Sequence, residues 1–165
     1  MQDRTMIAER LAQLGLSHLA PEDFKIEGEF TYWYVNPEGM RVSEDHTVPN
    51  LVVDSGKAFL ANRAISGAKN PISHVAIGSG TTPPALGQTQ LVAETARVAL
   101  STATSTNNVV NCAGTVPAGT GTGTVEEVAL FNAATLGDMI SRTLTGTITK
   151  PAGLGLQFTW TLTVN

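Results

Sequence analysis

The sequence is poor in cysteine and in charged residues, and each shortage excludes a class of protein. Its 165 residues include one cysteine, Cys112. The chain therefore forms no internal disulfide framework and no metal site built from two or more of its own thiolates. Charged residues make up 15% of the chain, against about 25% in an average domain. The net charge of −4 argues against a protein that binds nucleic acid through its phosphates.

Long apolar runs are also missing. No stretch approaches the roughly 20 apolar residues that a membrane helix needs, and the first residues lack the pattern of a secretory signal. We therefore expect no membrane partner and synthesis in a cytoplasm. A chain of this length buries roughly 70% of its unfolded surface, which is enough to fold without disulfides.

Charge divides the chain near Pro49. Residues 1–50 carry nine acidic and four basic side chains, whereas the rest of the chain carries five and six. The sequence therefore predicts an acidic N-terminal arm at residues 1–49 and a nearly neutral body, rich in threonine and glycine, at residues 50–165. We expect the body to stay folded when the arm is deleted, and the arm to be required for assembly.

Two segments of the arm have patterns of regular structure. Apolar residues recur at helical spacing over residues 5–14, and Gly15 follows them. Residues 24–35 alternate with period two, and the turn at residues 36–39 predicts a hairpin. The apolar faces need a partner, either the body of the same chain or a neighbouring subunit. The candidate interface residues are Leu11, Leu14, Phe24, Ile26, Phe30, Tyr32, Trp33 and Tyr34.

The body begins with a helix signal and continues with strand signals. Asp54 or Ser55 is placed to cap a helix that Gly67 ends. About six strands follow, one from residue 95 to 104, with a hairpin expected at Asn107 and Asn108. The clearest strand is residues 156–164, where apolar residues alternate with glutamine and threonine. We predict an all-β fold: an antiparallel β-sandwich with one short helix before its strands, plus an N-terminal arm of a helix and a β-hairpin.

Glycine-rich stretches occur at residues 78–80 and 119–123, but neither has the lysine of a phosphate-binding loop or runs into a helix. Both are interpreted as turns at the ends of strands. The histidines, His18, His46 and His74, are too widely separated to form a metal-binding motif. We interpret them as structural or subunit-contact residues.

Acidic residues and serines provide no catalytic set either. Glu126 and Glu127 are neighbours on a strand, so their side chains point to opposite faces and do not converge on one bond. One of them is expected to face Arg142 across the sheet. No Gly-x-Ser-x-Gly motif is present. We predict no catalytic, cofactor-binding or metal-ligating residues, and therefore a protein that is not an enzyme.

Six runs resemble, in the same order, segments of tailed-bacteriophage structural proteins. They are Asn50–Lys57 (NLVVDSGK), Ile72–Thr82 (ISHVAIGSGTT), Gly119–Ala133 (GTGTGTVEEVALFNA), Met139–Thr143 (MISRT), Ile148–Lys150 (ITK) and Leu156–Val164 (LQFTWTLTV). The nearest group is the tail-collar fibre and fibre-attachment proteins, and the resemblance covers about residues 50–165.

The resemblance implies a small, β-rich virion protein without a cofactor, assembled in the host cytoplasm. It implies a homotrimer that joins a fibre to a tail or baseplate. Its partners would be its own copies and other virion proteins of the tail, baseplate or capsid, and not nucleic acid.

Two other functions remain open at this stage. The chain ends directly after its last predicted strand, so we expect no fibre shaft and no receptor-binding tip. A short β-domain rich in threonine is equally suited to decorating a capsid. Alternatively, Tyr32, Trp33 and Tyr34 could stack on sugar rings and make a carbohydrate- or receptor-binding module.

Overall fold

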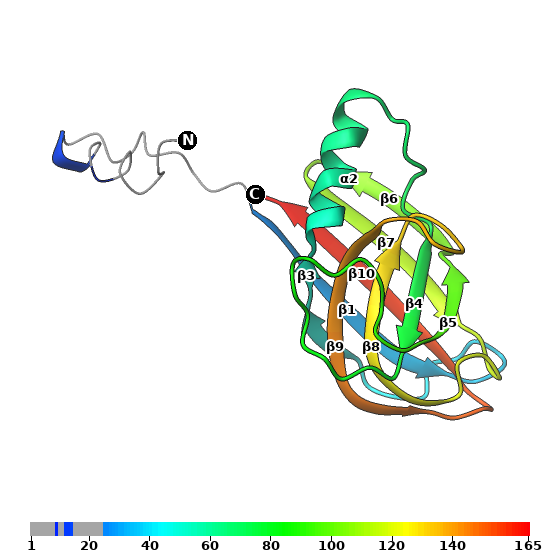
Figure 1. The fold of residues 1–165 in the computed structure, drawn as a ribbon. Coiled ribbons are helices and arrows are strands. Elements are labelled where there is room, and N and C mark those ends of the chain that lie inside the picture. Colours follow the sequence, from blue (N-terminus) through cyan, green and yellow to red (C-terminus); the bar gives the residue numbers. More distant parts are fainter. Residues whose placement is uncertain (1–8, 10–11, 15–24) are drawn as a thin grey trace.

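The computed structural model describes residues 9, 12–14 and 25–165. Residues 25–165 form two five-stranded antiparallel sheets packed face to face (Figure 1). Sheet A has the order β2 (His46–Pro49), β1 (Ile26–Val35), β10 (Gly155–Val164), β7 (Val109–Val116) and β6 (Thr102–Thr106). Sheet B has the order β3 (Leu51–Val52), β9 (Met139–Lys150), β8 (Gly123–Phe131), β4 (His74–Gly78) and β5 (Glu94–Ala99). The predicted all-β antiparallel sandwich is confirmed.

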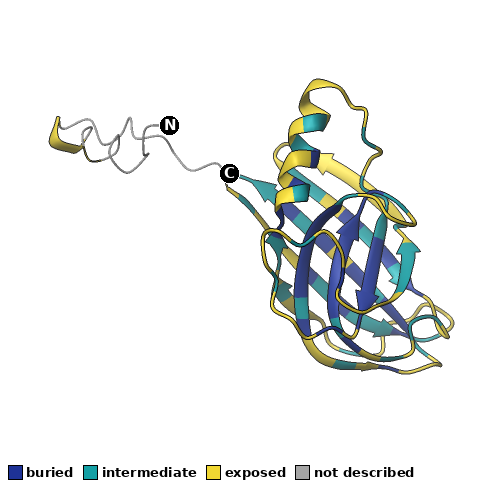
Figure 2. Cartoon of the chain, viewed as in Figure 1, coloured by how far each residue is buried: buried dark blue, intermediate teal, exposed yellow. Residues whose placement is uncertain are grey.

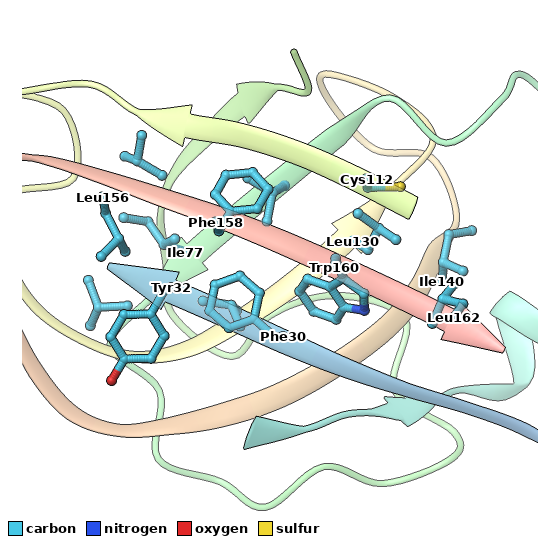
Figure 3. Packing of buried hydrophobic residues seen from close by; sticks show 14 of the residues in the cluster. Phe30, Tyr32, Ile77, Cys112, Leu130, Ile140, Leu156, Phe158, Trp160 and Leu162 are labelled. Carbon is cyan, nitrogen blue, oxygen red and sulfur yellow. The ribbon is translucent and has the colours of Figure 1, made fainter. Parts of the chain in front are cut away.

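Aromatic side chains from the centre of sheet A dominate the core between the sheets (Figure 3). The rings of Phe30 and Trp160 lie 5.0 Å apart, and those of Phe30 and Phe158 lie 5.8 Å apart. The indole of Trp160 donates to the amide oxygen of Asn50 at 2.7 Å, so its polar edge is satisfied inside the core. The alternation predicted for residues 156–164 is confirmed, because its apolar side chains are buried and its threonines face outward.

Helix α2 (Asp54–Ile65) precedes β4 as expected, but its start differs from the prediction. Neither Asp54 nor Ser55 caps it, because the N-cap residue is Val53 and the Ser55 hydroxyl donates to the Met139 carbonyl at 2.7 Å. That bond fastens the helix to β9 instead. Gly67, with φ 59°, follows the last turn as predicted.

Strand β1 corrects the predicted division of the chain at Pro49. It pairs with β10 along its whole length and with β2 on its other side. Residues 26–35 are therefore a central strand of the sandwich, and the partner of their apolar face is the body of the same chain. The alternating pattern predicted the strand, but the charge difference that suggested a boundary follows no structural division. Most of the helix expected at residues 5–14 lies outside the described residues.

One predicted strand is in fact two strands in different sheets. Residues 95–104 contain the end of β5 in sheet B and the start of β6 in sheet A. The chain changes sheets between Leu100, whose N–H donates to Ser73, and Ser101, whose N–H donates to Ala113. The hairpin at Asn107 is confirmed, since β6 and β7 pair around it and Asn107 has the positive φ of 54° that such a turn requires.

Candidate interaction surface

The predicted interface residues separate into different environments. Phe30 and Tyr32 are 0% and 4% exposed and belong to the core, so neither is available to a partner. Ile26 is half-buried against the same core. Leu14 is 59% exposed. Leu11 and Phe24 lie outside the described residues.

Trp33 and Tyr34 point to opposite faces of β1. Trp33 lies on the outer face, where its indole donates to Gln157 at 3.3 Å and the Arg41 guanidinium lies 5.2 Å from its ring centre. Tyr34 packs against the core, and its hydroxyl donates to the Thr149 carbonyl at 2.7 Å. The three aromatics expected to stack on a sugar therefore form no common platform.

The outer face of sheet A is a surface composed mainly of threonine. Strand pairing aligns Thr47, Thr31, Thr159, Ala113 and Thr102 in one row across all five strands. Since alternate residues share a face, the neighbouring rows follow from the same register. We call this surface the threonine face; it comprises Thr31, Trp33, Thr47, Thr102, Thr104, Thr106, Val109, Asn111, Ala113, Thr115, Gln157, Thr159, Thr161 and Thr163.

Charged side chains lie at both ends of this surface. Glu27 and Glu29 of β1 lie opposite Thr163 and Thr161 and share their face. At the other end the Arg41 guanidinium lies 5.2 Å from the ring centre of Trp33. The row between these ends, which contains Thr31 and Thr159, carries only hydroxyl and methyl groups. The hydroxyls of Thr31 and Thr47 lie 2.8 Å apart across the strand pair. The central row can be buried against a partner without the desolvation cost of lysine or glutamate, and charged residues are depleted in interface cores for this reason.

The sequence signalled the threonines but not their assembly into one surface. The alternation in residues 156–164 identified the outward side chains of β10. The rows also need the order β2-β1-β10-β7-β6, in which strands far apart in sequence become neighbours. No local pattern contains that order.

A buried ion pair lies on the outer side of sheet B, as expected for one of the two adjacent glutamates. Arg142 and Glu127 are both fully buried, and the Arg142 Nη2 lies 2.7 Å from the Glu127 Oε2. The Glu127 carboxylate also accepts the backbone N–H groups of Gly80, Val92 and Ala93 at 3.1, 3.1 and 2.7 Å. The pair therefore fastens both ends of the segment 79–93 over the sheet.

Each glycine-rich stretch has a structural role. A Cβ on Gly78 or Gly80 would collide with the Glu127 carboxylate, so these glycines make room for the ion pair. Gly119, Gly121 and Gly123 have positive φ values of 79°, 55° and 114° and shape the turn before β8. Their interpretation as loops agrees with the structure.

The described histidines have structural partners. The ring of His46 stacks on Tyr32 with centroids 5.3 Å apart, and His74 shares a 2.8 Å hydrogen bond with Ser73. Burial and the nearby Arg97 lower the pKa of His74, which favours its neutral form. His18 lies outside the described residues. Within the part of the chain that the structure describes, no three histidine, cysteine or acidic residues group as metal ligands.

Cys112 has the environment of a core residue. It is 2% exposed, and burial raises the pKa of its thiol to about 11. A thiol that stays protonated at neutral pH is a poor nucleophile. Among residues 25–165, no helix is long and apolar enough to cross a membrane.

The structure defines an all-β sandwich domain, and comparison with known families identifies the family to which it belongs. Residues 46–165 match the family model of the phage tail-collar fibre protein, N-terminal domain. The match covers most of the chain, so the chain belongs to this family. It is a structural component of a phage tail and therefore of the virion. No curated protein and no solved structure gives a match to the chain.

Proposed function

We propose that the protein is a non-enzymatic collar or fibre-attachment piece of the tail or baseplate, and that it acts as a homo-oligomer. The observation that carries this proposal is the threonine face, a five-stranded surface whose central row is uncharged. On a family domain that occurs in phage tails, such a surface is suited to permanent contact with a neighbouring tail subunit. Three copies is the number that the family resemblance implies.

Two observations favour this function over the alternatives. A carbohydrate module would need exposed aromatics side by side, but Tyr32 is buried and Trp33 is covered by Arg41. A capsid decoration protein would need the same kind of contact surface. That function therefore differs from the proposed tail function in the location of the protein on the virion and not in the chemistry of the contact. The family match to tail proteins favours the tail.

Thr159→Arg tests the role of the threonine face. Thr159 is exposed in the middle of the longest row, so an arginine there brings an unpaired charge into the proposed contact. We expect the variant to fold normally but to enter particles at least about tenfold less than the wild type, since one buried unpaired charge costs more than 1.4 kcal/mol. Quantitative blotting of purified particles measures incorporation, and electron microscopy counts their fibres.

Thr147→Arg is the matched control, because Thr147 is an exposed threonine of β9 in the other sheet. The control should enter particles at the wild-type level. Light scattering of the purified wild type should give at least three times the 17.3 kDa chain mass. Normal incorporation and normal fibres with Thr159→Arg would contradict the proposed use of this face.

A further inference from the structure

Strand β6 is an open sheet edge that lacks the usual protection. It pairs only with β7, and all five of its residues, Thr-Ala-Thr-Ser-Thr, are exposed (Figure 2). Alternation of the antiparallel ladder leaves N–H and C=O groups of every second residue pointing away from the sheet. The strand contains no lysine, proline or other residue that proteins use to block pairing at an edge.

The other edges of the two sheets are protected. β2 is four residues long and ends in Pro49, which has no N–H to donate. β3 has two residues, and the part of β9 beyond it contains Gly146 with φ 68°. β5 carries Glu94 and Arg97 and has a bulge in its pairing with β4. In the described part of the chain, β6 is thus the edge best suited to receive another strand.

We propose that β6 pairs with β6 of a second copy of this chain, antiparallel and centred on Thr104. The argument is the self-complementarity of the strand. In this register Thr104 faces Thr104 of the partner copy, Thr102 faces Thr106, and Ala103 faces Ser105. Threonine pairs across strands are favourable, and no charge meets a like charge.

The geometry of such a pair extends the contact beyond the two strands. The twofold axis runs perpendicular to the sheet, so the two sheets A become one and the two threonine faces lie on the same side. A twofold contact joins two chains only, so in a trimer it links a chain of one trimer to a chain of another. On the inner side, Ala103 and Ser105 border a groove of about 450 Å³. Helix α2 supplies Phe59 and Leu60 to this groove. The second copy adds apolar burial there, which a short strand pair needs for stability.

Disulfide formation tests this register. Paired Cα atoms in antiparallel strands lie about 4.5–5.5 Å apart, within the range that a disulfide spans. Thr104→Cys should therefore oxidise to a covalent dimer. In the Thr102→Cys variant, each cysteine lies opposite Thr106 of the second copy and four residues away from that copy's cysteine. The two cysteines are therefore roughly 13 Å apart, and this variant should not crosslink with itself. A mixture of Thr102→Cys and Thr106→Cys should crosslink.

The full chain is used in each case, with non-reducing gels as the readout. The native Cys112 is buried, so the wild type serves as the background control. We expect at least about tenfold more covalent dimer from Thr104→Cys than from Thr102→Cys, because a disulfide tolerates Cα separations only up to about 7 Å. Equal crosslinking of the two variants, or none from the Thr104→Cys protein, would overturn the proposal.

A charge variant gives a second measurement that needs no cysteine. Thr104→Lys places two lysines opposite each other and should weaken association at least about tenfold. Thr147→Lys makes the same change on β9 of the other sheet, outside the threonine face, and should leave association through β6 unchanged. Analytical ultracentrifugation measures both, with circular dichroism to verify folding. Unchanged association of Thr104→Lys would contradict β6 pairing. The contact does not depend on where the protein sits in the virion, so its failure would leave the proposed tail function standing.

Discussion

Deleting residues 1–49 is expected to unfold the protein completely. The deletion removes β1 and β2, and with them Phe30, Tyr32 and Val35 from the core. Each fully buried side chain of this size contributes about 1.5–3 kcal/mol, and the loss also uncovers Trp160 and Phe158 of β10. A domain whose total stability is about 5–15 kcal/mol does not survive the loss of a central strand.

The control is deletion of residues 2–23, which keeps every strand of the sandwich and the hydrogen bonds between Lys25 and Asn165. This variant should keep a cooperative urea transition, because every strand of the sandwich is present. Circular dichroism and tryptophan fluorescence follow both proteins. A folded, monodisperse product from the larger deletion would show that the sandwich does not depend on β1, as the charge division of the sequence had suggested.

Arg142→Met is expected to have the largest effect of any single substitution discussed. Arg142 donates to Glu127 through Nε and Nη2, to the Thr82 carbonyl at 2.8 Å and to Gln88 at 3.0 Å. Methionine fills much of the volume but leaves the Glu127 carboxylate buried without a countercharge. Removing one partner of a buried ion pair costs about 3–5 kcal/mol, which urea unfolding at 25 °C measures.

Arg41→Met is the matched control, because the Arg41–Asp45 pair is exposed, with side chains 45% and 60% accessible. Its loss should cost less than about 1 kcal/mol. The double variant Glu127→Gln/Arg142→Met should cost less than the sum of its single variants, since the two groups act together. A cost below about 1 kcal/mol for Arg142→Met would mean that the segment 79–93 is held by its other contacts.

Short sequence patterns correctly predicted the structural features that a few adjacent residues determine. Examples are the alternation around Trp160, the turn at Asn107 and the end of α2 at Gly67. The pairing of Glu127 with Arg142 was also predictable, since a carboxylate on a buried strand needs a cation nearby.

Features that depend on distant contacts were missed. The charge difference around Pro49 suggested a boundary, whereas pairing with β10 makes β1 part of the body. The switch between sheets at Leu100 is set by hydrogen bonds to Ser73 and Ala113, which lie far away in sequence. The threonine face and the open β6 edge likewise exist only once the strand order is known.

Immunolabelling of purified particles tests the central claim most directly. An antibody to this chain, imaged by electron microscopy, reports where the chain lies on the virion. We predict label confined to the tail end, at the collar or baseplate. For a site enclosed by other proteins, label should appear there after mild disruption of the particles. Label spread over the head would contradict the tail assignment and identify a capsid decoration protein.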